Sequence, residues 1–392
     1  MDRCKIVRRN KQSSASTYVG ESENTNTLPL DLIIEILLRL PAKSIAICRC
    51  VSKQWSSLLR RQDFTELYLT CSLSRRRLLF AIEFNGKWHF FSSPQPRNLD
   101  ENVSVVETDY HMRVSGEWNK DVCLSSNGFI CLFDKQIIKG KIDRVPVICN
   151  PSTGQRLPLP KVRARNIYLN SFFGYDPIEK QFKVLCMTVT NYRSQTSSKE
   201  HQVLTLGKGK LSWRMIKCLF PHYPEKKSNG ICINGVLYYI ARSDMTTLVA
   251  CFDVRSEKFS FIETEKGPKL TWISGLMNYM GKLGVLIQVY GGKDELWVQD
   301  DTDKDKRLKR ILIMPNTDHE IKQSFWATDT GEIVWMLSRW TRPIYVFYYN
   351  PERKCVRRVQ IKGIEEKLLI GIEDRPEAHF TFIDHIENVL FL

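Results

Sequence analysis

The sequence predicts an α+β chain of two domains, a small helical domain followed by a large all-β domain. Between residues 28 and 59 the apolar residues recur at helical spacing. From about residue 79 onward, short apolar and β-branched runs alternate with turns rich in Gly, Asn, Asp and Pro, a pattern typical of β-strands. These turns also recur at a similar distance, which indicates a repeated structural unit.

The first helix is expected between Pro29 and Pro41. Proline fits the first turn of a helix, where its missing N–H is not needed, but it cannot continue a helix. Glu35 and Arg39 stand four residues apart in the order that favours an ion pair. A helix on one small core needs an apolar stripe only about 100° wide, and this helix has much more. Its apolar residues are Leu32, Ile33, Ile34, Ile36, Leu37, Leu38 and Leu40. Part of this surface is therefore expected to be covered by something else.

Two further short helices are expected, one over Ala42–Cys48 and one beginning after Ser52, which is a suitable N-cap. Residues 60–74 form a connector with the spacing of one more helical turn. Three short helices bury too little apolar surface to be robust alone. They either bind a partner or form a cap on the domain that follows them in the chain.

The order of motifs in this region resembles the F-box. Leu28-Pro29 is followed by Ile36-Leu-x-Arg-Leu-Pro41, by Cys48-Arg-x-Val-Ser-Lys-x-Trp55 and by Phe64. The resemblance implies docking onto a Skp-type adaptor and, through it, a cullin–RING (SCF) ubiquitin ligase. The adaptor-binding residues that it implies are Leu28, Pro29, Asp31, Leu32, Ile36, Leu37, Leu40, Val51 and Trp55.

Composition excludes several classes of protein. The apolar share of 43% and the charged share of 26% are ordinary for a globular chain. No apolar run is long enough to span a membrane, and no secretory signal is visible behind the basic N-terminus. The twelve cysteines favour buried thiols in a reducing compartment, here the nucleus or cytoplasm. Cys48-x-Cys50 lacks a second pair of ligands, so no metal and no cofactor is expected.

The β-region repeats a glycine turn that leads into an apolar strand. Successive turns stand roughly 40–50 residues apart, except for one long gap that holds an extra unit, and about six units of four strands predict a β-propeller. A β-sandwich pair is the alternative. The last strand, from His379, is expected to close the ring against the first blade. The glycine turns are Asn85-Gly86, Asn127-Gly128, Asn234-Gly235, Met280-Gly281 and Thr330-Gly331, and the strand-ending turns begin at Asn150, Asp176, Asp253 and Asn350.

This second region is similar to the F-box associated interaction domain of the large plant F-box family. The resemblance lies in Asn-Pro-Ser-Thr-Gly-Gln (150–155), Phe-Gly-Tyr-Asp-Pro (173–177), Asn-Gly-Val-Leu-Tyr-Tyr (234–239) and Phe-Asp-Val-Arg-Ser-Glu-Lys-Phe (252–259). It implies a domain that recruits an unidentified protein substrate, with no catalytic residue of its own. The expected parts are a disordered tail (1–27), the F-box (28–64), a connector (65–78) and the β-domain (79–392).

Particular motifs and residues bear on the alternative functions. No nucleophile-elbow, P-loop or HExxH motif is present. A sugar-binding propeller or propeller enzyme would need exposed aromatic rings, for which Trp340 and Tyr223 are the candidates, or converging carboxylates. The net charge of +15 raises the question of nucleic acid, but the basic residues 304–310 alternate with acidic ones, and we expect solvated loops instead. His379, Asp384 and His385 are expected to belong to a closing strand and turn rather than to a ligand set.

Overall fold

The computed structural model describes residues 28–96, 103–115, 124–138, 141–162, 168–189, 200–207, 209–225, 230–243, 246–263, 270, 274–289, 293–299, 308–314, 322–371, 374–376 and 378–390. The predicted disordered tail, 1–27, lies outside these residues. The chain divides into two compact units, of which the first ends at Arg39 and the second begins at Leu40. Among the described residues, no helix is both long and apolar enough to cross a membrane.

The helical region confirms the expected elements and extends one of them. Helix α1 (Leu30–Arg39) ends before Pro41, α2 spans Ala42–Cys48, and α3 spans Lys53–Leu59. The hydroxyl of Ser52 caps α3 by accepting a hydrogen bond from the backbone N–H of Trp55 at 3.1 Å. The ion pair between Glu35 and Arg39 forms at 2.6 Å.

The connector is a full helix, not the single turn that the sequence predicted. Helix α4 spans Gln62–Leu73. Phe64, Tyr68 and Ser72 are buried on one face at intervals of four residues. The apolar residues Phe64 and Tyr68 mark only one turn of this face, and the next buried position is the polar Ser72. The apolar pattern alone therefore underestimated the length of α4.

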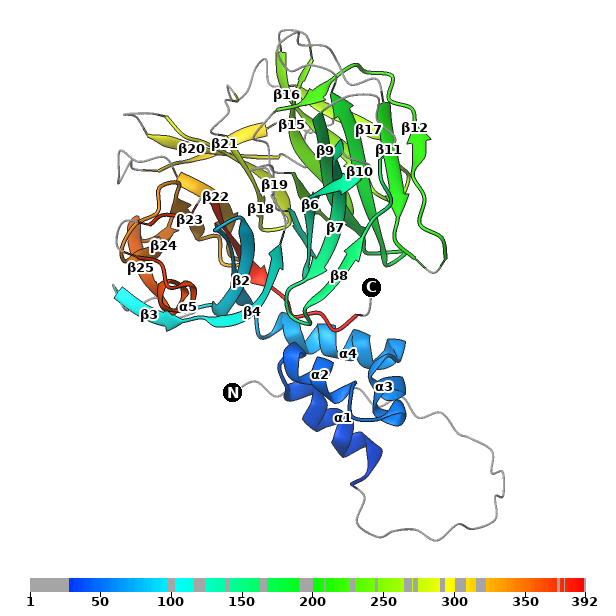
Figure 1. Ribbon diagram of the computed structural model, residues 1–392. Coiled ribbons are helices and arrows are strands. Elements are labelled where there is room, and N and C mark those ends of the chain that lie inside the picture. The colour runs from blue at the N-terminus through cyan, green and yellow to red at the C-terminus, as the bar shows by residue number, and fades with distance from the viewer. Residues whose placement is uncertain are drawn as a thin grey trace, which may run out of the picture. The chain divides into compact units, whose positions relative to one another are not determined.

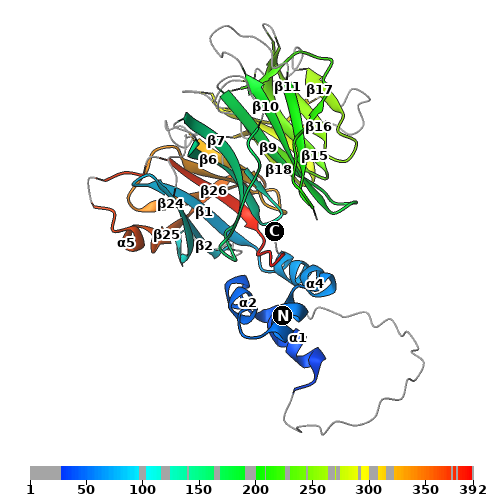
Figure 2. The same ribbon diagram turned by 45° about the vertical axis from the view of Figure 1, so that its right-hand side comes forward.

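The β-region forms six sheets of four or five mainly antiparallel strands, arranged as a six-bladed propeller (Figures 1 and 2). The sequence prediction of about six blades is confirmed. The sheets are β26 (Ala378–His385), β1 (Arg77–Phe84), β2 (Lys87–Pro94) and β4 (Asp109–Ser115); β5 (Leu124–Ser126), β6 (Phe129–Ile138), β7 (Lys141–Asn150) and β8 (Gln155–Pro158); β9 (Tyr168–Asp176), β10 (Gln181–Val189), β11 (Glu200–Thr205) and β12 (Arg214–Ile216); β13 (Tyr223–Pro224), β14 (Ile231–Ile233), β15 (Val236–Ser243), β16 (Thr246–Asp253) and β17 (Phe259–Glu263); β18 (Gly275–Tyr279), β19 (Lys282–Ile287), β20 (Asp294–Gln299) and β21 (Leu308–Met314); and β22 (Lys322–Ala327), β23 (Ile333–Leu337), β24 (Ile344–Asn350), β25 (Cys355–Lys362) and β3 (Val103–Glu107).

The ring is closed twice. As predicted, the C-terminal strand β26 pairs with β1 and completes the first blade, which joins the two ends of the domain in one sheet. The sequence did not predict the second closure, in which β3 leaves the first blade and pairs in parallel with β25 of the last blade. The hydroxyl of Thr108 continues this contact by donating to the carbonyl of Lys362 at 2.9 Å. A short helix, α5 (Ile364–Leu368), follows β25.

The repeated turns have the geometry that their sequences indicated. In four of the five glycine turns the residue before the glycine also has a positive φ, as a tight hairpin turn requires; Asn127 and Gly128, for example, have φ of 48° and 86°. Most of these turns join the first strand of a blade to the second. The Asn85-Gly86 turn instead joins the second strand of its blade to the third, because β26 supplies the first. Similarly, Asp176 ends a first strand, whereas Asn150, Asp253 and Asn350 each end a third strand.

The core lies between neighbouring blades. One cluster, for example, packs Leu79 and Phe90 of the first blade against Ile130 and Val147 of the next. Because each inner face is covered by the adjacent blade, the strands bury apolar residues on both faces, and their sequences read as continuous apolar runs.

Candidate adaptor-binding surface

Helix α1 exposes an apolar face to solvent. Leu32 and Ile36 are 47% and 51% exposed, and a spacing of four residues places them on one side of the helix. Leu37 is 2% exposed and Ile33, Ile34 and Leu38 are half-buried, so the helix also has the buried stripe that a small core needs. This confirms that the apolar surface of α1 exceeds what its own packing uses.

The nine residues implied by the F-box resemblance fall into three classes of exposure. Leu37 is buried. All nine residues remain predicted contacts. Leu28, Pro29, Asp31, Leu32, Ile36 and Val51 are exposed, whereas Leu40 and Trp55 are half-buried.

Leu30 and Ile47 are exposed apolar residues that the sequence reasoning did not include. Leu30, at the start of α1, is 50% exposed, and Ile47, near the end of α2, is 63% exposed. Ile47 stands four residues before Val51, which is also exposed. That spacing was the available signal, but a single apolar residue at the end of a short helix gives no periodicity to read.

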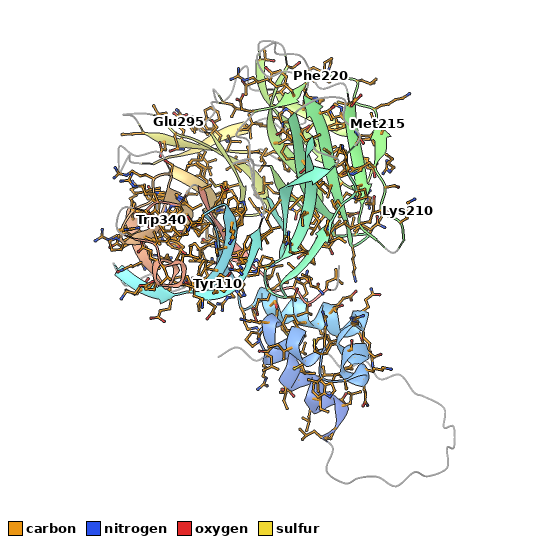
Figure 3. All side chains as sticks on the ribbon, viewed as in Figure 1. Tyr110, Lys210, Met215, Phe220, Glu295 and Trp340 are labelled. Atoms are coloured by element: carbon orange, nitrogen blue, oxygen red, sulfur yellow. The ribbon has the colours of Figure 1, made fainter. Side chains whose placement is uncertain are left out.

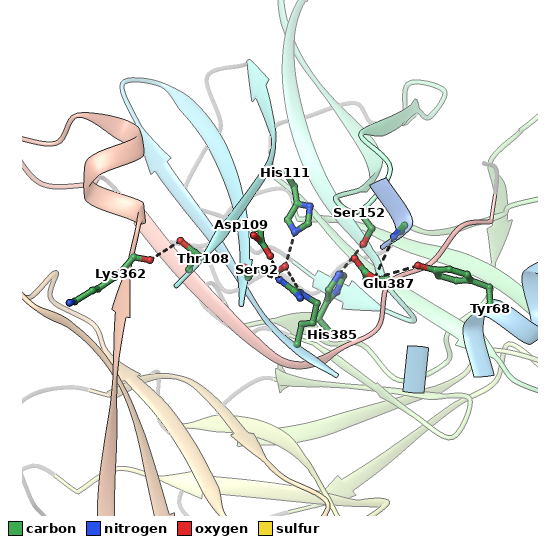
Figure 4. Close-up of polar contacts among 11 residues, drawn as sticks. Tyr68, Ser92, Thr108, Asp109, His111, Ser152, Lys362, His385 and Glu387 are labelled. Atoms are coloured by element: carbon green, nitrogen blue, oxygen red, sulfur yellow. Dashed lines mark hydrogen bonds and ion pairs between the residues drawn. The ribbon is translucent and has the colours of Figure 1, made fainter. Parts of the chain in front are cut away.

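Helices α2 and α4 contact the C-terminal segment of the chain through Glu387. Its carboxylate accepts hydrogen bonds from the backbone N–H of Ala42 and from the hydroxyl of Tyr68, both at 3.4 Å (Figure 4). Ala42 begins α2, and an acidic group is favourable beside the free N–H groups of a helix start. Burial, with a smaller contribution from the charge of Glu387, raises the pKa of Tyr68 well above its usual value.

The same segment contacts the propeller turns. The side-chain amide of Asn388 donates to the carbonyl of Asn127 at 2.9 Å, and the amide of Asn150 donates to the carbonyl of Asn388 at 2.8 Å. The guanidinium of Arg49 donates to the carbonyl of Val389 from the opposite side. Residues 386–390 therefore lie between helices α2–α4 and the face of the ring that carries these turns.

Beside this segment are two buried serine–histidine pairs (Figure 4). Ser92 Oγ lies 2.7 Å from His111 Nε2, and Ser152 Oγ lies 3.3 Å from His385 Nε2. Burial lowers the pKa of His111 to about 4 and that of His385 to about 3. Both hydroxyls are buried, at 0% and 2% exposed, so a substrate cannot reach them as nucleophiles.

The residues named for a sugar-binding, enzymatic or ligand-binding role are buried or bonded to other parts of the propeller. Trp340 and Tyr223 are buried, so neither presents a ring to a sugar. A cavity of about 340 Å³ has Asp384 as the one carboxylate among its described lining residues, so no second described carboxylate meets it there. His379 and His385 bond to different groups, Leu337 and Ser152, and both lie in the closing strand as predicted.

The consecutive arginines at 75–77 include two that form ion pairs within the domain. Arg76 contacts Asp384 at 3.2 Å, and Arg77 contacts Asp109 at 2.5 Å. Burial raises the pKa of the Asp384 carboxyl, an effect that the charge of Arg76 opposes. These contacts give the cluster a structural role. Most of the second basic cluster, 304–310, lies outside the described residues.

The structure also assembles a group that the sequence reasoning missed. It expected no metal, because Cys48-x-Cys50 lacks a second pair of ligands. His201, Cys218 and His222 nevertheless meet, with one potential ligand atom from each lying within 4.8 Å of the others. Burial lowers the pKa of His222 and lowers that of His201 to about 4, whereas it raises the pKa of the Cys218 thiol.

Comparison with known proteins identifies both parts of the chain. Residues 26–67 match the F-box domain, and residues 77–386 match the F-box associated beta propeller domain. A putative F-box protein of Arabidopsis thaliana is 54% identical over 395 residues, which cover 100% of this chain and 80% of the relative. The F-box protein DOR of Arabidopsis thaliana is 43% identical over 401 residues, which cover 98% and 99% of the two chains.

Solved structures add little to this. Prolyl oligopeptidase B from Galerina marginata is similar over 78% of this chain and 41% of that protein, at 10% identity and a TM-score of 0.39, which is too low to support a conclusion. The family matches and the relatives cover the chain from the helices to the closing strand. The chain therefore belongs to the family of F-box proteins that carry an F-box associated β-propeller domain.

Proposed function

We propose that this chain is the substrate-recognition subunit of an SCF-type ubiquitin ligase. Its F-box docks a Skp-type adaptor, and its propeller recruits a protein target. The protein carries out no bond chemistry itself, and its contribution is to hold the target close to the ubiquitin-transferring enzymes. The F-box family supports this role in general.

The exposed apolar face of α1 carries the proposal. About half of the surface of Leu32 and of Ile36 is exposed to water, on a helix that is apolar on most of its circumference. Burying the exposed half of such a side chain stabilises a complex by about 0.8–1.5 kcal/mol. A few anchors of this kind usually dominate the affinity of an interface.

The propeller face that carries the turns after β5 and β7 contacts residues 386–390, which in turn contact α2 and α4. The opposite face of the ring carries the turns between second and third strands. We assign target recognition to that face, because it is the one not used by the segment that joins the propeller to α2–α4. Loops of this kind commonly carry recognition on a rigid scaffold.

The site of action that we propose is the nucleus or the cytoplasm. Ten cysteines in the described part of the chain are free thiols, and four of them are buried. This fits the reducing environment of those compartments.

The adaptor-binding step is tested with the purified full-length chain and a purified Skp-type adaptor. The double variant Leu32→Ala/Ile36→Ala should bind about 10- to 100-fold more weakly than the wild type, since burying the exposed halves of two anchors contributes about 1.5–3 kcal/mol together. Leu369→Ala is the matched control, because Leu369 is 86% exposed but lies in the propeller. Equal affinity of the double variant and the wild type, or no binding by a folded wild type, would refute the docking proposal.

A further inference from the structure

The chain crosses from the third blade to the fourth through a segment rich in groups that bind metals. His201 is in β11, which pairs with β12, and β12 ends at Ile216. Cys218 follows two residues later, and His222 immediately precedes β13 of the next blade. Three side chains that are 21 positions apart at most are thus gathered where two blades meet.

The separations fit one small cation. In a tetrahedral zinc site with bonds of about 2.0–2.3 Å, the ligand atoms lie about 3.3–3.8 Å apart. The Cys218 Sγ and His222 Nδ1 atoms are 3.8 Å apart, and the three ligand atoms lie within 4.8 Å of one another. Bringing ligand atoms that are up to 4.8 Å apart to the tetrahedral separation needs a movement of about 1 Å. Cys218 is partly exposed, so its side chain has room for this movement.

The buried histidine of β11 has a ring nitrogen that bonds to none of the described residues. His201 is 2% exposed, and its Nε2 atom is buried with no hydrogen-bond partner in the part of the chain that the structure describes. Buried polar atoms in native proteins nearly always have a partner, so an exception calls for an explanation. A bound cation beside this ring supplies one.

The second histidine is oriented as metal-bound histidines usually are. His222 Nε2 lies 2.6 Å from the hydroxyl of Tyr239, which lies 3.7 Å from the sulfur of Met187. When that hydroxyl donates to Met187, it accepts from Nε2–H and leaves the Nδ1 lone pair directed to the side of Cys218. An outer hydrogen bond that fixes the tautomer in this way is typical of histidine ligands.

Hydrogen bonds replace the metal when none is bound. The carbonyl oxygen of Phe220 lies 3.0 Å from His222 Nδ1 and 3.3 Å from Cys218 Sγ, so it can accept a hydrogen bond from the ring N–H or from the thiol. Binding of a divalent cation removes the thiol proton of Cys218, which is released to water as the metal–sulfur bond forms.

The chemistry of the ligands selects the metal. One thiolate and two imidazoles suit zinc and related transition metals, whereas magnesium and calcium prefer oxygen ligands. The rings of Phe259 and Phe261 lie 5.7 and 5.0 Å from that of His222, which makes the surroundings apolar and resistant to water. We propose that His201, Cys218 and His222 bind one zinc ion, with a water molecule in the fourth position, and that the ion fixes the crossing between these two blades.

A consequence concerns the residues between the ligands. Leu219 is 95% exposed and Phe220 is 38% exposed, and both lie between Cys218 and His222. Figure 3 shows Phe220 and Met215 at the outer edge of these blades. A metal bound by Cys218 and by His222 holds the exposed residues between them, Leu219 and Phe220, in one conformation.

The test uses the full-length protein after removal of metal with a chelator. The wild type is expected to take up one equivalent of Zn²⁺ and to unfold at a higher temperature with it, since a ligand of the native state stabilises that state. Cys218→Ser and His201→Gln should each bind Zn²⁺ at least tenfold more weakly. Cys355→Ser removes an exposed thiol elsewhere in the propeller and should bind as the wild type does.

Cobalt gives a readout that does not depend on any variant. Co²⁺ added to the wild type should produce the absorption bands of a tetrahedral site with a thiolate ligand, and Cys218→Ser should lose the thiolate band. The proposal is overturned if the folded wild type takes up no metal. It is equally overturned if Cys218→Ser binds as well as the wild type, or if Cys355→Ser loses binding to the same extent.

Discussion

The carboxylate of Glu387 accepts a hydrogen bond from the hydroxyl of Tyr68 at 3.4 Å, although the two residues are 319 positions apart in the chain. Tyr68 is fully buried in α4, and its single hydroxyl proton is shared between Glu387 and the carbonyl of Leu40, which lies closer, at 2.8 Å. The end of the propeller chain and the connector helix are thus joined by a buried polar contact. A contact of this kind defines an orientation more sharply than apolar packing does, because hydrogen bonds are directional.

This contact predicts a measurable coupling between the two side chains. In a double-mutant cycle of Tyr68→Phe and Glu387→Ala, the interaction should contribute about 0.5–1.5 kcal/mol to the free energy of unfolding. Denaturant unfolding of the four proteins measures it. The exposed pair Arg61 and Asp63, which contact each other at 2.5 Å, is a control that should show less coupling. Additive effects of Tyr68→Phe and Glu387→Ala would contradict the role given to this bond.

Leu37 and Leu32 should separate stability from adaptor binding. Leu37→Ala removes a buried side chain and should lower the free energy of unfolding by about 2–5 kcal/mol. Leu32→Ala should change stability by less than about 1 kcal/mol, because its side chain is half in water already. Binding to the adaptor should fall in Leu32→Ala without any loss of folded protein. The reverse pattern, with Leu32→Ala unstable and still binding, would show that the two roles are exchanged.

Gly128 is required for the approach of the C-terminal segment to the ring. Its φ is +86°, and a Cβ atom there would lie 2.5 Å from the carbonyl oxygen of Ile386. Gly128→Ala should therefore lower the free energy of unfolding by about 1–3 kcal/mol more than Gly86→Ala does. Gly86 is the matched control, since its φ of +67° imposes the same backbone strain but a Cβ would meet no atom of the described residues within 4 Å. Thermal or denaturant unfolding of both variants measures this difference. Equal losses of unfolding free energy would mean that the backbone at Ile386 moves away from residue 128 at little cost.

Buried neutral histidines should make the protein sensitive to acid. Burial holds the pKa of His385 at about 3 and that of His111 at about 4, below the unfolded value of about 6.5. The unfolded chain therefore binds more protons in this window, so stability is complete above about pH 6.5 and falls as the pH drops through 4 and then 3. Each histidine should contribute a slope of up to about 1.4 kcal/mol per pH unit.

The histidine contribution is measured by unfolding at a series of pH values. His385→Gln keeps a polar group able to reach Ser152 but cannot bind a proton in this range, so its stability should fall less steeply between pH 6.5 and 4 than that of the wild type. Parallel curves for the two proteins would show that His385 does not contribute to the acid response.

Much of the architecture followed from short-range patterns. Pro29 and Pro41 mark where α1 is possible, Ser52 caps α3, and Asn127-Gly128 forms the tight turn that its sequence favours. Each of these depends on the conformational preference of a few consecutive residues. The number of blades followed in the same way, because turns of one kind recur at a similar spacing.

The sequence predicted that α1 has more apolar surface than one small core needs, and the exposed Leu32 and Ile36 show where that surface lies. It could not show that Leu37 is buried. Which part of an apolar helix faces the core depends on what packs against it, and that is a property of the folded chain.

The sequence by itself determined the elements, the repeat and the family resemblance, because each is written in residues close together in the chain. Only the tertiary structure decided that β3 pairs with β25, that Glu387 meets Tyr68 and Ala42, and that His201, Cys218 and His222 converge. These contacts join residues that no local preference relates. They form because closing the ring and packing one blade on the next bring distant segments together, and the apolar burial that drives this packing has no direction of its own.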